Sequence, residues 1–170
     1  AIYEGTTDIQ ALDLVGRKMI LKNGALFQTL MEQFSKNIEK NKEVPELKTV
    51  YSQWEQQCES IYEMSMESKQ IMEKQGIEGV VLYATPFLKF LASVTAAGFL
   101  LEQAVVAVSK LEGLIHEKAV EDSGLKEFIE ENSDARFLNN KIITAHYFVE
   151  AIVPEVEALM SGAKNQNYGA

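Results

Sequence analysis

The stretch LKTVYSQWEQQCESIYEMSMESKQIM, residues 47–72, decides the fold of this chain. A seam of mostly apolar residues recurs along it at alternating spacings of four and three, which keeps side chains on one face of a helix in a bundle. The seam consists of Leu47, Tyr51, Trp54, Cys58, Ile61, Ser65, Ser68 and Met72. The charged outer face consists of Glu55, Glu59, Glu63 and Glu67. The stretch therefore predicts a long amphipathic helix that packs against other helices.

The next helix on the carboxyl side is apolar nearly all round. Pro45 suits the first turn of the seam helix, where its missing amide hydrogen costs nothing, and Gly76 ends that helix. The following helix is predicted from Gly79 through Val108, with a possible continuation to Val120 and a kink at Pro86. Such a helix belongs inside a bundle or against a second subunit. Small residues that would let neighbouring helices approach closely are Ala92, Ala96, Ala97 and Gly98.

Two further helices are predicted before the seam helix. Thr7 and Gln10 have the spacing of a capping box, so the first helix is expected to begin there and to end at Asn23 and Gly24. Its apolar face is predicted to be Ile9, Leu12, Val15 and Met19. The second helix ends in the polar stretch 40–43. Its predicted apolar face is Leu26, Phe27, Leu30, Phe34 and Ile38.

The last third of the chain predicts one short and one long helix. The sequence Asp-Ser-Gly at 122–124 breaks the helical pattern, and residues 125–131 can form a short helix. Ser133 or Asp134 is expected to cap the last long helix, which should bend near Pro154. A polar tail is expected to fray from Gly162 onward. Because no stretch shows strand alternation, the fold class is predicted to be all-α, an up-down four-helix bundle preceded by one lead-in helix.

Composition narrows the classes of function. The 170 residues are 46% hydrophobic, which suffices for a packed core, and carry a formal net charge of −9. That charge argues against binding nucleic acid or an anionic membrane surface. Cys58, the single cysteine, excludes an internal disulfide and a cysteine-based zinc site, and is expected to fill the core. A single cysteine suits a reducing compartment, so the chain is expected to be cytoplasmic.

The two histidines predict no metal centre. A di-iron bundle would need two Glu-x-x-His motifs, and neither is present. Glu112 lies one helical turn before His116, a pairing more typical of a solvated face than of a ligand pair. His146 lies beside the apolar stripe of the last helix, so we expect a hydrogen-bonded histidine in the core or at a subunit interface. No metal ligand is therefore assigned.

The first ten residues contain a distinct motif. Tyr3, Glu4, Gly5, Thr6 and Thr7 lead through Asp8 to Ile9 and Gln10, at the start of the first predicted helix. This segment resembles the Tyr-Glu-Gly-Thr-x-x-Ile-Gln motif of the acyl-CoA dehydrogenases, which are flavoenzymes. The alternative interpretation is purely structural, because an exposed glutamate, a loop glycine and capping hydroxyls open many helices.

The resemblance implies a role for each residue of the motif. Glu4 would be the base that removes the α proton of an acyl-CoA, and its backbone amide would hydrogen-bond the thioester carbonyl. Gly5 would lie against the substrate, where a side chain would obstruct it. Thr6, Thr7 and Asp8 would contact the flavin of FAD. The reaction implied is oxidation of an acyl-CoA to the enoyl-CoA, with FAD taking the β hydrogen as hydride.

A looser resemblance covers the rest of the chain. Residues 12–18, 84–88 and 141–148, with Val153 and Pro154, are similar to the branch of this family that carries a long helical extension. It implies that residues 1–23 end the catalytic core, that 24–162 form an appended bundle and that 163–170 are a frayed tail. The implied partners are acyl-CoA, electron-transfer flavoprotein or a similar acceptor, and further copies in a homo-oligomer of two or more subunits.

Taken alone, the fragment is expected to be inactive, with its bundle serving assembly or active-site shielding. An alternative from another class is a non-catalytic helical oligomerisation or interaction module. A third possibility is peripheral docking on a membrane, which the negative charge disfavours.

Overall fold

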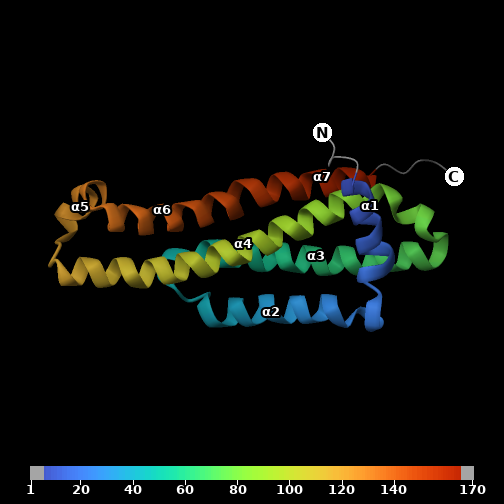
Figure 1. Cartoon of the computed structure of the whole chain (residues 1–170), viewed down its shortest axis with the longest axis horizontal. Coiled ribbons are helices and arrows are strands. Elements are labelled where there is room, and N and C mark those ends of the chain that lie inside the picture. Colours follow the sequence, from blue (N-terminus) through green and yellow to red (C-terminus); the bar gives the residue numbers. More distant parts are fainter. Residues whose placement is uncertain (1–5, 166–170) are drawn as a thin grey trace.

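The computed structural model describes residues 6–165 and consists there of helices and turns, with no strand (Figure 1). The α-helices are α1 (Thr6–Asp13), α2 (Ala25–Asn41), α3 (Lys48–Gln75), α4 (Ile77–Glu117), α5 (Leu125–Glu131), α6 (Ser133–Tyr147) and α7 (Val153–Asn165). A π-helical turn, Phe148–Ile152, joins α6 and α7 into one rod. The prediction of an all-α bundle is therefore confirmed.

Helix α4 lies at the centre of the bundle. It contacts α1, α2, α3, α6 and α7, and α2 lies on the side of α3 away from α6 and α7 (Figure 1). Because α4 has 41 residues and α3 has 28, α4 runs past the beginning of α3 and pairs there with α6 as a two-helix arm. Helix α4 has the length and composition of a membrane-crossing helix, as core helices of bundles also do, and 44% of its most apolar window is buried.

The seam of α3 forms the middle of the core. Its residues from Leu47 through Ser68 are buried, and Met72 packs at the edge of the core. Trp54 is fully buried, and its indole Nε1 donates a hydrogen bond to the carbonyl of Val94 on α4 at 2.9 Å. Phe34 of α2 stacks on the same indole, with 5.3 Å between ring centroids. Trp54 thereby joins α2, α3 and α4.

The Trp54 ring packs directly against Gly98 of α4. A Cβ added at Gly98 would lie 2.6 Å from Cζ2 of the indole, well inside van der Waals contact. The indole is fully buried and hydrogen-bonded, so it has no room to move aside. The close approach predicted from the small residues of this helix is confirmed at Gly98 and at buried Ala97, while Ala92 is exposed.

Two core positions predicted in the helices before α3 are wrong. Ile9 of α1 is 68% exposed, because this helix packs through Ala11 and Val15 instead. Leu26, in the first turn of α2, is 53% exposed, whereas Phe34 and Ile38 of that helix are buried. Both errors fall near the beginning of a helix.

The helix ends agree with the sequence in some places and not in others. Asn23 and Gly24 end the first helical segment as predicted, in a turn where Lys22, Asn23 and Gly24 are all left-handed. The capping prediction for Thr7 is wrong, because α1 begins at Thr6 and places Thr7 inside its first turn.

The predicted cap of the last long helix also needs correction. Asn132, rather than Ser133 or Asp134, caps α6: its side-chain oxygen accepts from the amides of Asp134 and Ala135, each at 3.0 Å. At the other end of this rod, α7 continues to Asn165, three residues past the predicted end of the bundle. Residues 166–170 of the predicted tail lie outside the described residues.

The irregularity near Pro154 is compensated by a side chain from α3. In the π-helical turn the amide of Val153 bonds to the carbonyl of Phe148, and Pro154 has no amide hydrogen to offer. The carbonyl of Val149 therefore lacks a donor from its own helix. The buried amide of Gln57 supplies one, with Nε2 donating to Val149 O at 3.0 Å. This bond ties α3 to the α6–α7 rod at the predicted bend.

We predict that Gly98→Ala lowers the free energy of unfolding by about 2 kcal/mol, because the new Cβ overpacks the Trp54 ring. Gly113→Ala is the matched control on the same helix, since nothing lies within 4 Å of a Cβ added there. The control should stabilise the chain by up to about 1 kcal/mol, because alanine is the better helix former. Urea unfolding measures both, and equal effects of the two substitutions would contradict the assigned contact.

We predict that Gln57→Met lowers the free energy of unfolding by about 1 kcal/mol, because it leaves the carbonyl of Val149 buried without a donor. The loss should be smaller in a Pro154→Ala background, where residue 154 regains an amide hydrogen. Urea unfolding of the four chains of this double-mutant cycle measures the difference. Strict additivity would show that Pro154 and Gln57 are not linked through this carbonyl.

Candidate functional site

The amino-terminal motif enters the bundle through α1, which lies across the first half of α4 (Figure 1). Ala11 and Val15 are buried on its inner face, and Leu12 and Leu14 pack at the edge of the core. The outer face carries exposed Thr6, Ile9 and Gln10. The start of α1 therefore presents an uncovered surface in which an apolar side chain stands among polar ones.

The predicted site residues divide between described and undescribed positions. Glu4 and Gly5, the predicted base and substrate contact, lie outside the described residues. The predicted flavin contacts Thr6, Thr7 and Asp8 form the first turn of α1, with Thr6 and Asp8 exposed and Thr7 half-buried. The structure thus brings these three together on one helical turn.

Asp8 has a partner on another helix. The hydroxyl of Thr85 on α4 donates to its Oδ1 at 2.6 Å, across 77 positions of sequence. Because a hydrogen bond to a charged acceptor is stronger than a neutral one, this contact fixes the start of α1 against α4. One carboxylate oxygen of Asp8 is therefore already engaged within the chain. Sequence analysis found Thr85 only as part of a resembling segment, with no role of its own.

The charges at the end of α1 satisfy one another. The guanidinium of Arg17 donates to both carboxylate oxygens of Asp13, and Lys18 lies 3.4 Å from the same carboxylate. The hydrogen bond from Arg17 is the main cause that holds the pKa of Asp13 below its usual value. These residues span the π-helical turn Leu14–Lys18, so their role is to brace that turn.

The histidines carry no catalytic geometry. His116 and Glu112 are exposed on α4, as the solvated-face interpretation predicts. Nε2 of half-buried His146 lies 2.9 Å from the carbonyl of Glu46, and Nδ1 lies 3.5 Å from the carboxylate of Glu150. His146 is thus the hydrogen-bonded histidine that was predicted, joining α6 to the turn before α3. The described residues contain no cluster of three or more His, Cys, Asp or Glu side chains that could hold a metal ion.

The buried side chains of Cys58 and Tyr51 stay protonated near neutral pH. Burial, and then the carboxylates of Glu55 and Glu59, raise the pKa of the Cys58 thiol far above its ordinary value, so it stays neutral as core filler. Burial raises the pKa of Tyr51 to about 12, and its hydroxyl donates to the side-chain oxygen of Asn37 at 2.9 Å. Neither side chain is placed to act as a nucleophile or a base.

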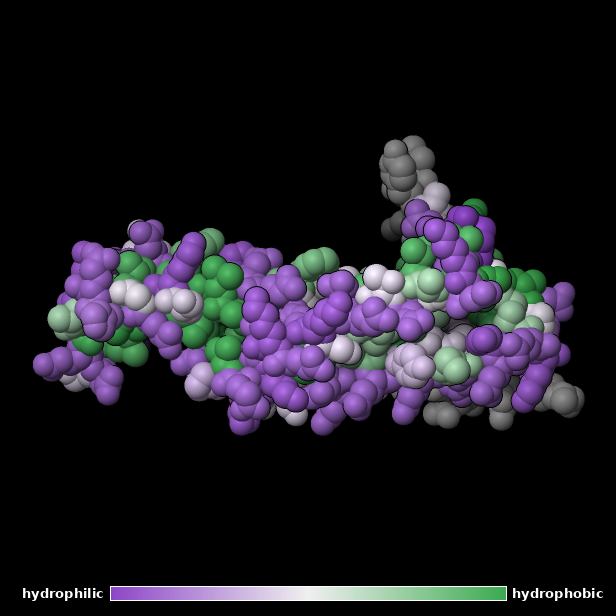
Figure 2. Space-filling view, turned by 90° about the horizontal axis from the view of Figure 1, so that it is seen from below, coloured by the Kyte–Doolittle hydropathy of each residue, from purple (hydrophilic) through white to green (hydrophobic). Residues whose placement is uncertain are grey.

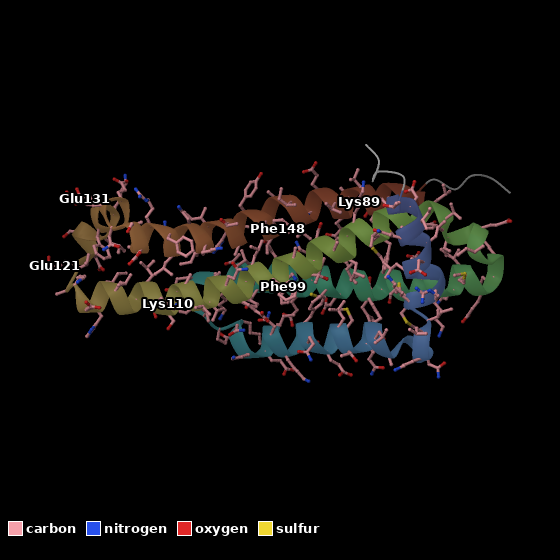
Figure 3. All side chains as sticks on the ribbon, in the orientation of Figure 1. Lys89, Phe99, Lys110, Glu121, Glu131 and Phe148 are labelled. Carbon is pink, nitrogen blue, oxygen red and sulfur yellow. The ribbon has the colours of Figure 1, made fainter. Side chains whose placement is uncertain are left out.

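Two hollows in the bundle were missed by sequence analysis. A cleft of about 1070 Å³ lies between α2 and α3, beside the end of the first helical segment. A shallower hollow of about 510 Å³ lies between α4 and α6, lined by Phe99 and Lys110, which Figure 3 labels, and by Phe137. Figure 2 shows hydrophobic surface toward the end of the molecule that holds the two-helix arm. The one available signal for the cleft was the pair of serines at seam positions 65 and 68.

Comparison with known proteins finds one family. The family model described as "Acetyl-CoA dehydrogenase C-terminal like" matches residues 27–168. Two proteins of Syntrophomonas wolfei subsp. wolfei, each named butyryl-CoA dehydrogenase, are similar to this chain. One is 26% identical over 164 residues, covering 96% of this chain and 24% of the relative. The other is 26% identical over 162 residues, covering 91% of this chain and 23% of the relative.

The chain therefore spans about a quarter of the length of these relatives. No solved structure matches it.

We predict that Thr85→Val loosens the start of α1, because it removes the hydrogen bond to Asp8 while keeping the shape of the side chain. Amide hydrogen exchange in α1 should accelerate by an amount that corresponds to about 1 kcal/mol. Thr95→Val is the control, since Thr95 bonds only to the carbonyl of Leu91 in its own helix. Exchange in α1 that is unchanged by Thr85→Val would show that Asp8 does not anchor this helix.

Proposed function

The chain belongs to the family of acetyl-CoA dehydrogenase C-terminal-like domains, and on this basis we propose that it is the carboxyl-terminal part of an FAD-dependent acyl-CoA dehydrogenase. The whole enzyme would oxidise an acyl-CoA to the enoyl-CoA. The observation that carries this proposal is the order of two features: the family match begins at residue 27, and the motif that resembles the catalytic segment of acyl-CoA dehydrogenases lies directly ahead of it.

The proposal divides the chain at the turn that ends the first helical segment. Residues 1–23 would complete the catalytic core, and residues 24–162 would form the appended bundle. The left-handed turn Lys22–Gly24 separates the two parts, and α1 rests on α4 through one face only. Its outer face, with Thr6 and Ile9 exposed, would be covered by the rest of the core. The exposure of these residues supports the proposal that further protein packs against the start of α1.

Glu4 would supply the proton chemistry. Removing the α proton of a thioester requires a base, and a carboxylate becomes effective near neutral pH when a dry pocket raises its pKa from about 4.3. The backbone amide of Glu4 would stabilise negative charge that develops on the thioester carbonyl. Gly5 would leave room for the substrate to approach. Substrate and surrounding core would together exclude the water that otherwise favours the ionised glutamate.

The first turn of α1 would contribute to holding FAD, which when bound accepts the β hydrogen as hydride. The side chains of Thr6 and Thr7 offer hydroxyl groups at the exposed start of this helix, and such groups suit a polar cofactor. Asp8 fits less well, because one of its carboxylate oxygens already accepts from Thr85. We therefore assign flavin contact to Thr6 and Thr7 and a positioning role to Asp8.

The bundle would serve assembly or shielding of the active site. Helices α4 and α6 expose aromatic side chains that most monomeric proteins would bury: Phe99 is 62% exposed and Phe137 is 60% exposed. Contact with the catalytic core or with a second subunit would cover them. The whole enzyme would then be a cytoplasmic homo-oligomer that passes its electrons to electron-transfer flavoprotein or a similar acceptor.

The test is an anaerobic titration of the complete polypeptide with a panel of acyl-CoAs, followed by its visible spectrum. Bound flavin should bleach with at least one acyl-CoA, and Glu4→Gln should abolish bleaching while flavin stays bound. Glu78→Gln is the control, because Glu78 is an exposed glutamate in the first turn of α4 and is not part of the motif. The 170-residue chain alone should be colourless and inactive.

A complete polypeptide that binds no flavin and ignores every acyl-CoA would overturn the catalytic proposal. It would favour a non-catalytic helical interaction module instead, for which the exposed Phe99 of α4 and Phe137 of α6 are the supporting observation. Removing residues 24–170 from the active enzyme tests the role of the bundle. Unchanged activity and unchanged oligomeric state after that truncation would contradict assembly and shielding together.

A further inference from the structure

The cleft between α2 and α3 exists because the seam of α3 changes character. Along its first half the seam presents large side chains, and Trp54 and Phe34 hold α2 close. Further along, the seam positions carry Ser65 and Ser68, which are too small to fill the space that large residues fill elsewhere. The two helices therefore enclose a cleft of about 1070 Å³, near the upper end of the range for small-molecule sites.

The walls of the cleft are apolar and adaptable. Four of the six methionines of the chain line it, namely Met19, Met31, Met66 and Met72. The other two, Met64 and Met160, are buried in the core. Methionine side chains are unbranched and polarizable, and they adjust to the shape of a flexible apolar ligand. The other apolar or aromatic lining residues are Val15, Ile20, Phe27, Tyr62 and Val80.

One polar group in the cleft lacks a partner. Ser68 is only 7% exposed, and its hydroxyl makes no hydrogen bond with any described residue. Ser65, one turn earlier, is satisfied by donating to the carbonyl of Tyr62 at 2.7 Å. The hydroxyl oxygen of Ser68 is accessible from the cleft, so it can donate a hydrogen bond to a ligand there. Ser68 thus marks where the polar end of a ligand would lie.

The shape and the rim restrict the class of ligand. The lining residues on α3 run from Tyr62 to Glu73, which at the helical rise corresponds to a length of roughly 16 Å. Lys69, beside Ser68, lies on the rim and makes no ion pair with a described residue. Carboxylates also line the rim, so the cleft is no general anion site: they are Glu32, Glu39 and Glu73. An elongated apolar chain with one small acceptor group fits these features.

We propose that the cleft between α2 and α3 binds an unbranched fatty acyl chain, whose carbonyl or carboxylate oxygen accepts a hydrogen bond from Ser68. The chain would lie along the methionines, and Lys69 would attract the oxygen-bearing end. This site is separate from the amino-terminal motif and does not depend on the catalytic proposal. The ligand is either a free fatty acid or its thioester, which share this chemistry.

The experiment uses the 170-residue chain labelled with ¹³C at its methionine methyl groups, titrated with dodecanoate and, separately, with dodecanoyl-CoA. The NMR signals of Met19, Met31, Met66 and Met72 should shift with at least one of the two. Those of Met64 and Met160 should stay in place, because these residues lie in the core away from the cleft. The arm that binds identifies the acid or the thioester as the ligand.

Three variants test the role assigned to Ser68. Ser68→Leu should fill the cleft and abolish binding, while the melting temperature of the free chain stays the same or rises, because leucine continues the apolar seam. Ser68→Ala should weaken binding by about five- to tenfold through loss of one hydrogen bond. Ser60→Leu is the matched control: it lies on α3, outside the cleft, and should leave the affinity unchanged.

Three results would overturn the proposal. The first is the absence of methionine shifts with both dodecanoate and dodecanoyl-CoA. The second is an equal shift of all six methionines, which would indicate non-specific disruption by an amphiphile. The third is unchanged affinity in a folded Ser68→Leu chain. Because none of these measurements involves flavin or turnover, their outcome is independent of the catalytic test.

Discussion

The contact of Trp54 on α3 with Gly98 on α4 is the constraint on which the rest of the structure depends. The Trp54 ring occupies the space where any side chain at position 98 would lie, and glycine is the residue that permits it. The same indole donates to the carbonyl of Val94 and stacks with Phe34. One side chain thereby sets the spacing of α3 from α4 and holds α2 on the opposite side. The large buried surface of the indole makes this crossing the firmest part of the bundle.

The shape of the bundle away from the contact of Trp54 with Gly98 depends on how the helices extend from it. Helix α2 is held at Phe34, and toward its beginning the seam of α3 offers Ser65 and Ser68, so a cleft opens there. In the other direction α4 outruns α3, so its end is paired with α6. Phe99, next to Gly98 on α4, is 62% exposed and lines the hollow between α4 and α6. The cleft between α2 and α3 and the hollow between α4 and α6 are thus the two surfaces that the packing leaves available for binding.

Buried polar groups connect the elements that apolar packing leaves loosely defined. Gln57 satisfies the carbonyl that Pro154 leaves without a donor, and thereby fixes α3 against the α6–α7 rod. Thr85 fixes the start of α1 through Asp8, so the helix that follows the amino-terminal motif is anchored to α4. Each link joins residues distant in sequence, and each satisfies a group that would otherwise be unpaired or mobile.

The sequence by itself determined the all-α class, the seam of α3, the stops at Asn23–Gly24 and Gly76, and the irregular turn near Pro154. These depend on side-chain spacing and on backbone preferences of single residues, which act locally. Only the tertiary structure decided that Ile9 and Leu26 face outward, that Gln57 serves Val149, and that two seam serines border a cleft. These outcomes depend on which helices meet and at what distance, and one close contact between a tryptophan and a glycine sets that distance.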